Sequence, residues 1–271
     1  MPNIVISDPA DPRINVFQGL RDHTLRQKRE RPGGDMAGVF ICEGDIPVGR
    51  AIDAGYDLES ILIDGARTKP LPSYVDSSVT VYAAEPQVVS KITGYTEHRG
   101  CIACFVRRPV DDIDDLDLDK AKTLLILEGI NNPTNMGVIL RCGAGLGVDA
   151  VVLDRTCSDP LYRRSVRVSM GEALRTPYAR VEDFEIAMAK LRSYGFEIWA
   201  LTPADDAEDI SQMKRPPSGK VAVMLGTEGA GLTESAIRIA DRTIKIPMSG
   251  EVDSINVGAA GAIALYALSN I

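Results

Sequence analysis

The chain has 271 residues, of which 45% are hydrophobic and 25% are charged, so its composition is typical of a soluble globular protein. Its five cysteines, an odd number, favour a reducing compartment, and we find neither a signal peptide nor an apolar stretch long enough to cross a bilayer. We therefore expect a cytoplasmic protein with no membrane partner and with one large domain or two ordinary ones.

The net charge of −8 gives no support to nucleic-acid binding, because contacts with phosphates normally dominate that affinity. Six of the acidic residues form one run at 111–119, however, and the basic residues gather at 21–31, 99–108 and 163–167. A local basic patch can bind phosphate on an acidic protein, so the net charge does not exclude this class either.

The first 35 residues are polar and basic, and Pro9 and Pro12 prevent an early helix. Residues 26–31 are expected to continue a helix that ends at Pro32. Its basic side, which includes Arg29, is either a solvated helix face or a patch that contacts RNA.

From Val39 onward strands alternate with helices, which predicts a small α/β unit of about 75 residues that is large enough to fold alone. Strands are expected at 39–42, 58–63, 79–82 and 101–106, and helices at 46–54 and 85–93. Residues 107–122, with Pro109 and the aspartate run, are typical of an interdomain linker.

Cys101 and Cys104 have the Cys-x-x-Cys spacing of a zinc knuckle or a redox pair, but no second such pair completes four ligands. On a strand, positions three apart point to opposite faces, so we expect ordinary strand packing. The two histidines, His23 and His98, are far apart in sequence and provide little for a catalytic triad or a metal centre. We predict no metal site.

The second half begins with a buried strand at 123–127, a polar loop, and a helix at 137–147 for which Asn135 is the expected N-cap. Arg141 follows about one turn into the helix, on the side that faces the strand ends. Ligands of open parallel sheets bind beyond those ends, so Arg141 is placed near a substrate. The alternative is that Arg141 pairs with Glu128 and only ties the helix to the strand.

A strand at 150–153, a helix at 181–194 and a strand at 197–201 continue the alternation, which predicts a parallel sheet covered on both faces. The long connection at 157–178 between them contains several arginines, whose guanidinium groups suit phosphate contacts. The predicted fold class is therefore α/β, with a parallel-sheet domain after a smaller α/β domain.

The last fifty residues contain a buried strand at 221–225, a turn of small residues at 226–231, and a helix with Thr233 as its N-cap. A second strand at 244–247 ends in proline, and an apolar helix closes the chain. These two strand ends should lie close together and form a pocket built largely from backbone. A dinucleotide enzyme is the alternative, although the glycine spacing in 226–231 is reversed from the dinucleotide fingerprint.

Three segments, 132–141, 225–231 and 246–257, resemble the motifs of the SpoU/TrmH family of RNA ribose methyltransferases in the SPOUT superfamily. The resemblance implies a trefoil-knotted parallel-sheet domain at 123–271 that forms homodimers. Residues 1–110 resemble the RNA substrate-binding domain of many family members, and 111–122 would be the acidic linker.

By this resemblance the chain transfers a methyl group from S-adenosylmethionine to a ribose 2′-hydroxyl of structured RNA, with rRNA preferred over tRNA as the substrate. The implied catalytic residues are Arg141, Asn135, Ser254, Asn256 and Glu228. The implied cofactor-binding residues are Leu225, Gly226, Thr227, Gly231, Ile246, Met248, Ser254 and Ile255. The expected RNA contacts are Arg163, Arg164, Arg167, Arg29 and Arg99.

The family account makes Arg141 the group that activates the ribose hydroxyl, but an arginine side chain is a poor base. It could instead hold the hydroxyl and a phosphate in line and stabilise the charge as the oxygen ionises. Gly258 stands where the family usually has serine, so one hydroxyl is missing from the third motif. A catalytically idle RNA-binding protein on the same fold is the second alternative.

Overall fold

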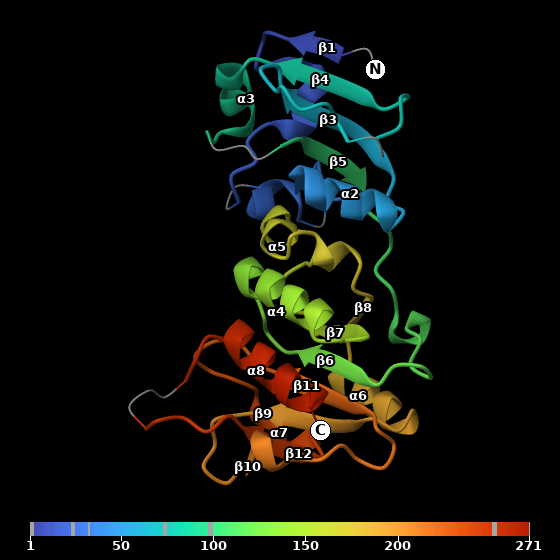
Figure 1. The fold of residues 1–271 in the computed structure, drawn as a ribbon, viewed down its shortest axis with the longest axis vertical. Coiled ribbons are helices and arrows are strands. Elements are labelled where there is room, and N and C mark those ends of the chain that lie inside the picture. The colour runs from blue at the N-terminus through green and yellow to red at the C-terminus, as the bar shows by residue number, and fades with distance from the viewer. Residues whose placement is uncertain are drawn as a thin grey trace. The chain divides into compact units, whose positions relative to one another are not determined.

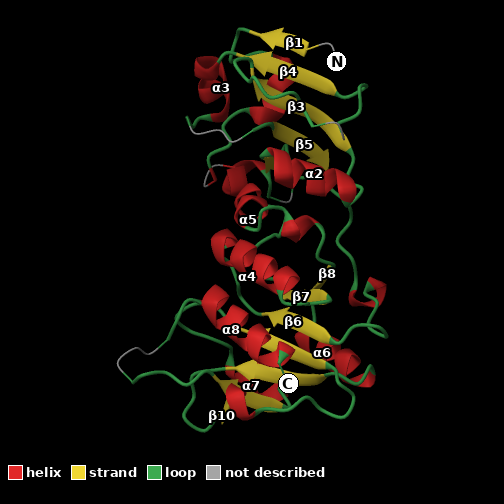
Figure 2. Cartoon of the chain, viewed as in Figure 1, coloured by secondary structure: helices red, strands yellow, loops and turns green. Residues whose placement is uncertain are grey.

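The computed structural model describes residues 3–22, 25–31, 33–72, 75–96, 100–250 and 254–270, so His23, His98 and Arg99 lie outside the described part. The chain divides into two compact units, Met1–Pro109 with Pro160–Arg175, and Val110–Asp159 with Thr176–Ile271 (Figure 1). Both units combine helices with a β-sheet (Figure 2), which confirms the α/β fold class.

The first unit is built on a five-stranded mixed sheet with the order β1-β4-β3-β5-β2. Its strands are β1 (Asn3–Ile6), β2 (Val39–Glu43), β3 (Leu58–Asp64), β4 (Thr80–Ala84) and β5 (Ile102–Val106). Strands β1, β4 and β3 are parallel, whereas β5 is antiparallel to both β3 and β2. All but β1 were expected; that strand is only four residues long, and its apolar residues stand in a segment whose overall composition is polar and basic.

Helices cover both faces of this sheet. They are α2 (Asp45–Asp53), α3 (Pro86–Thr93) and α5 (Arg163–Val168), with short helical turns at Pro12–Phe17, Leu25–Arg29 and Glu172–Leu174. Phe40 and Phe105 lie in the core on one face, and Ile41 and Cys104 lie in the core on the other. Cys101 belongs to the Phe40 side, so the two cysteines of the Cys-x-x-Cys segment pack on opposite faces, as expected.

The second unit is built on a seven-stranded sheet with the order β10-β12-β9-β11-β6-β7-β8, and every pair of its described strands is parallel. The strands are β6 (Thr123–Leu127), β7 (Ala150–Asp154), β8 (Tyr178–Val181), β9 (Glu197–Leu201), β10 (Glu208–Asp209), β11 (Val221–Leu225) and β12 (Arg242–Lys245). Strands β6 and β11 are buried along their whole length because both of their faces are covered.

Two helix layers cover this parallel sheet. The helices are α4 (Pro133–Gly145), α6 (Phe184–Ser193), α7 (Glu234–Ile239) and α8 (Val257–Ser269), and 3-10 turns lie at Ile113–Asp115 and Ile210–Gln212. Side chains of α6 and α7 share a core with Leu124 and Ile126. Helices α4 and α8 pack together on the opposite face, where Gly143 and Gly261 lie against Leu125 and Leu225.

The acidic segment at 111–122 differs from the expected linker. Ile113, Leu116 and Leu118 alternate with the aspartates and are buried in the core of the second unit. Asp112 caps the 3-10 turn at Ile113–Asp115, and the other aspartates point their charge to solvent or to a lysine partner. The run is therefore an amphipathic part of the second unit, which the charge count alone conceals.

The start of α4 also differs from the expected one. Asn132, not Asn135, is the N-cap, and its side chain accepts a hydrogen bond from Thr134 N at 2.8 Å. Pro133 occupies the first helical position, where a missing N–H costs nothing. The shift of the helix start by one turn places Asn135 inside the helix, where its side chain is buried.

Candidate functional site

A cavity of ≈ 380 Å³ lies at the carboxyl ends of β9, β11 and β12 in the second unit. It is lined by Leu201, Thr202, Pro203, Leu225, Gly226, Thr227, Glu228, Gly229, Gly231, Ile246, Met248, Ser254, Ile255, Asn256, Val257 and Ala260. All eight residues that the resemblance assigns to cofactor binding are among them. The cavity lies where a parallel sheet binds its ligands.

The turn between β11 and α7 shapes one wall of this cavity. Thr227 O accepts a hydrogen bond from Gly231 N at 3.0 Å, which closes the turn into a tight loop. A Cβ on Gly226 would overlap the backbone of Gly231 and Leu232. Glycine is therefore required at this position by the turn's own backbone.

Polar side chains from three segments meet at the rim of the cavity. The Asn256 side-chain amide donates to Oδ1 of Asn135 at 3.1 Å and also to Oε1 of Glu228. The Asn256 Oδ1 accepts from the backbone N–H groups of Gly258 and Ala259, so this residue is also the N-cap of α8. The structure therefore brings together three of the five expected catalytic residues, and Ser254 lines the cavity beside them.

Arg141 is exposed on α4 and does not line the cavity. Val138 lies three residues earlier and therefore on the same side of α4, and it contacts Gly258 at the start of α8. Arg141 thus lies on the side of α4 that faces the capped end of α8. Within the described ranges, Arg141 forms no ion pair or side-chain hydrogen bond with another residue.

Glu128 has a partner other than Arg141. Its carboxylate accepts from Thr233 N at 2.8 Å and from Thr233 Oγ1 at 2.7 Å. Thr233 in turn caps α7 through Ala236 N, which confirms it as an N-cap. The expected alternative, an Arg141–Glu128 tie, is therefore wrong for this structure, because Glu128 links β6 to the start of α7.

The cavity also contains residues that the sequence analysis missed. Leu201 is the last residue of β9, and Thr202 and Pro203 follow it; this strand lies between β11 and β12 in the sheet. The sequence does contain a pattern that could have identified these residues. The apolar strand at 197–201 is followed closely by a proline, as is the strand before Ile246 and Pro247.

The arginines expected to contact RNA occupy different environments. Arg29 donates to the carbonyl groups of Asn15 and Gln18 and pairs with Asp35, so its guanidinium holds the N-terminal segment together. Arg163 is buried in the first unit, whereas Arg164 and Arg167 are partly exposed there. The connection at 157–178, which carries these three arginines, was expected to belong to the parallel-sheet domain, but its residues Pro160–Arg175 belong to the first unit.

No group of three or more His, Cys, Asp or Glu side chains in the described ranges is arranged to hold a metal ion. In the same ranges, no helix has the length and the apolar composition needed to cross a membrane.

Comparisons with known proteins agree with these features. Residues 122–266 match the model of the SpoU rRNA Methylase family. A Mycobacterium bovis protein named as an uncharacterized tRNA/rRNA methyltransferase is 36% identical over 263 residues, which cover 96% of this chain and 90% of that protein. The 23S rRNA (guanosine-2′-O-)-methyltransferase RlmB of Vibrio vulnificus is 35% identical over 176 residues, 62% of this chain and 69% of the relative.

Solved structures share the fold over nearly the whole length. An AdoMet-bound rRNA methyltransferase from Sinorhizobium meliloti superposes with a TM-score of 0.82 at 22% identity and covers 98% of this chain and 97% of that one. A structure described as an RNA 2′-O ribose methyltransferase has a TM-score of 0.76 at 24% identity, with 98% of each chain covered. The matched family model spans more than half of the chain and includes the two motifs that line the cavity and the segment at 132–141, whose Asn135 binds Asn256. The chain therefore belongs to the SpoU rRNA methylase family.

Proposed function

We propose that the chain transfers a methyl group from S-adenosylmethionine to a ribose 2′-hydroxyl of structured RNA, with rRNA as the substrate class. The observation that carries this proposal is the junction at Asn256, which joins two other motif residues beside a cavity of suitable size. Family membership and the RlmB relative support the reaction type.

The residues around the cavity fit the cofactor. Leu225, Ile246 and Ile255 offer apolar walls for an adenine ring, and the turn at 226–231 offers backbone groups that can read its edge. Glu228 places a carboxylate at the rim, where a positively charged sulfonium or amino group would be favoured. When bound, S-adenosylmethionine supplies an activated methyl group, so the protein must mainly align it with the acceptor oxygen.

Arg141 has the role of holding the RNA in this proposal. Its side chain is exposed on α4, one turn after Val138, which packs against Gly258 at the start of α8. A guanidinium there can hold a phosphate and stabilise the charge that develops as the ribose oxygen ionises. Asn135 and Glu228 keep the Asn256 amide oriented, so they support the shape of the rim.

The test of the proposed function uses the full chain and total RNA. Labelled S-adenosylmethionine should transfer its methyl group to RNA, and alkaline hydrolysis should leave the label in dinucleotides, because a methylated 2′-oxygen cannot attack the adjacent phosphate. Label in mononucleotides would indicate methylation of a base and would contradict ribose methylation. Binding of RNA and cofactor without any transfer would favour the catalytically idle alternative.

We also infer that the protein is a homodimer that uses α8. Tyr266 is 64% exposed, and with Ala259 and Ile263 it forms an apolar stripe along this helix. A second copy of the helix would cover the stripe. Tyr266→Lys should give a monomer in light scattering, whereas Ile186→Lys, a change at a 68% exposed residue of α6, should not. A wild-type monomer at micromolar concentration would contradict this inference.

A further inference from the structure

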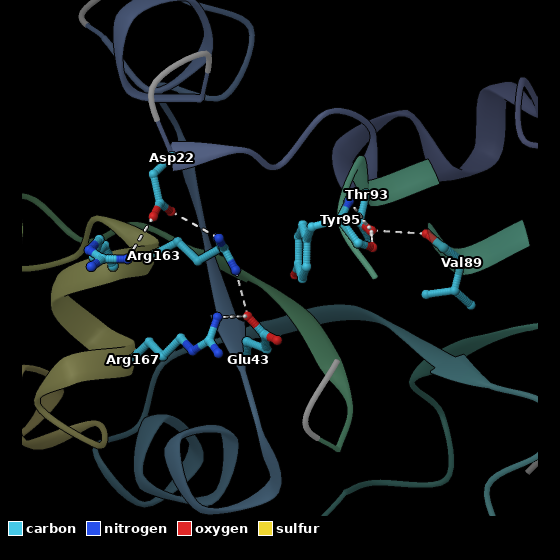
Figure 3. Close-up of polar contacts among 8 residues, drawn as sticks. Asp22, Glu43, Val89, Thr93, Tyr95, Arg163 and Arg167 are labelled. Atoms are coloured by element: carbon cyan, nitrogen blue, oxygen red, sulfur yellow. Dashed lines mark hydrogen bonds and ion pairs between the residues drawn. The ribbon is translucent and has the colours of Figure 1, made fainter. Parts of the chain in front are cut away.

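Five charged side chains of the first unit form a continuous series of ion pairs (Figure 3). Arg163 is central, with Nη2 at 2.9 Å from Asp22 Oδ1 and Nη1 at 2.5 Å from Glu43 Oε2. Arg164 extends the series from Asp22 at 3.4 Å, and Arg167 extends it from Glu43 at 3.6 Å. We call these five residues the arginine–carboxylate lattice. Its directly paired members lie up to 142 positions apart in the chain.

The centre of the lattice is anchored inside the unit. The Arg163 side chain is only 6% exposed, and its guanidinium lies 4.6 Å from the centre of the Tyr95 ring. Glu43 is buried as well, with its side chain only 1% exposed. A buried charge is tolerated only when it is paired, so Arg163 and Glu43 hold each other in place. Arg163 is therefore a structural residue, which corrects its expected place on the RNA surface.

The two ends of the lattice reach the surface. The side chains of Arg164 and Arg167 are 49% and 36% exposed. They are three residues apart on α5, so they point to the same side of the helix. Their contacts with carboxylates are longer than those of Arg163, as expected for side chains that extend outward.

The outward face of the lattice is positive. Arg163 and Glu43 are both buried and offset each other, so the exposed part of the lattice consists of the two guanidinium groups of Arg164 and Arg167 and one carboxylate, that of Asp22. Arg21 and Lys91 add two cations at a hollow that is also lined by Tyr95, the residue beneath Arg163. This basic region belongs to a protein whose net charge is −8, so it is a local concentration of positive charge.

We propose that Glu43 and Asp22 are positioning residues that fix Arg164 and Arg167 as a phosphate-binding pair for the RNA substrate. This proposal rests on the proposed function, since it assigns a surface to the same RNA. The guanidinium group of arginine binds phosphate oxygens bidentately, and a guanidinium group that is already held in place loses less conformational entropy when it binds. The first unit then contributes to RNA affinity through α5 and leaves the methyl-transfer step to the second unit.

The first experiment measures RNA binding of the full chain across a range of KCl concentrations. Arg164→Gln and Arg167→Gln should each weaken binding by about five- to tenfold and lower the slope of log affinity against log salt by about one. Affinity for S-adenosylmethionine and kcat at saturating RNA should not change. Arg13→Gln is the matched control, because Arg13 belongs to the same unit, is 53% exposed and also pairs with an aspartate.

The second experiment separates positioning from bulk stability. Glu43→Gln should raise KM for RNA about as much as Arg167→Gln does, and Glu43→Asp should recover part of the loss because it restores the charge. If Glu43→Gln fails to fold, the two exposed arginine variants still decide the question. If Arg164→Gln and Arg167→Gln both show the wild-type slope of log RNA affinity against log salt concentration, the proposal is wrong.

The proposed function fails in a different way. If the wild-type protein transfers no methyl group, the reaction assignment is wrong whatever the salt slopes show. If the wild-type protein methylates RNA and Arg164→Gln and Arg167→Gln bind that RNA as tightly as Arg13→Gln, only the lattice is refuted.

Discussion

The side-chain amide of Asn256 donates a hydrogen bond to Oδ1 of Asn135, which lies 3.1 Å away and 121 positions earlier in the chain. The same amide reaches Glu228, and the Asn256 Oδ1 caps α8. One side chain therefore joins the three sequence motifs of the family and starts the C-terminal helix. The junction explains why segments so distant in sequence form a single site.

The first prediction separates the two roles of Asn256. Asn256→Asp keeps the capping oxygen but removes both donated hydrogen bonds and places a carboxylate beside Glu228. We expect methyl transfer to fall by on the order of a hundredfold, with little loss of helix stability. Asn256→Ala should in addition lose about 1 kcal/mol of capping energy.

Turnover and thermal unfolding of both variants check this prediction. Asn270→Asp, at the other end of α8, is the matched control and should keep wild-type turnover. An Asn256→Asp variant that methylates RNA at the wild-type rate would show that the donated hydrogen bonds are dispensable.

The second prediction concerns Gly258, which stands where the family usually has serine. A Cβ at this position would lie 2.6 Å from Cγ1 of Val138, so with valine at position 138 the observed packing of α8 against α4 requires glycine here. We expect Gly258→Ser to destabilise the protein by about 1–3 kcal/mol in urea denaturation. Val138→Ala should restore most of that loss in the double variant, because it removes the clashing methyl groups.

Gly145→Ser is the control for this substitution, because a Cβ at position 145 of α4 meets no atom within 4 Å. It should leave the free energy of unfolding close to the wild-type value. Equal destabilisation by Gly258→Ser with and without Val138→Ala would contradict the proposed steric conflict.

The third prediction concerns the thiols. Burial raises the pKa of the Cys101 thiol to about 12, with a further contribution from Asp45. Burial also raises the pKa values of Cys42, Cys104 and Cys157. At pH 8 a thiol-reactive reagent should therefore label only Cys142, which is partly exposed, in the native protein. Rapid labelling of two or more thiols would contradict this burial.

The raised thiol pKa also predicts a direction for stability against pH. The folded protein keeps Cys101 protonated where the unfolded chain ionises, so above pH about 9 the folded state binds more protons. Its contribution to stability is complete below that pH and is lost as the pH rises toward about 12. Urea denaturation should show a steeper loss between pH 8 and 10.5 for the wild type than for Cys101→Ala. If the free energy of unfolding falls equally steeply with pH in the two proteins, Cys101 makes no such contribution.

Sequence reasoning succeeded where the signal was local. The apolar runs at 123–127 and 221–225 predicted fully buried strands, and the glycine turn after the second run predicted the cavity wall. It failed for β1, which is short, and for the aspartate run, where Ile113, Leu116 and Leu118 anchor the segment in the core. The placement of α5 in the first unit is explained by Val166, which is buried in the core with Phe40, and by the pairing of Arg163 with Glu43, 120 positions away, and no local pattern reveals either contact.

The fourth prediction concerns Arg141 and its alternative role. If Arg141 acts on RNA in the transition state, Arg141→Ala should lose at least about a hundredfold in turnover while cofactor affinity and melting temperature stay close to the wild type. Arg141→Lys should fail as well, because an ammonium lacks the bidentate fork. Glu128→Gln should instead lower the melting temperature, because Glu128 binds Thr233 at the start of α7.

The most direct measurement is the turnover of folded Arg141→Ala at saturating RNA and S-adenosylmethionine, read as label in alkali-stable dinucleotides. The wild-type protein should produce such dinucleotides, and the variant should produce at most about one hundredth as many at the same melting temperature. A folded Arg141→Ala variant that methylates ribose at close to the wild-type rate would contradict the account.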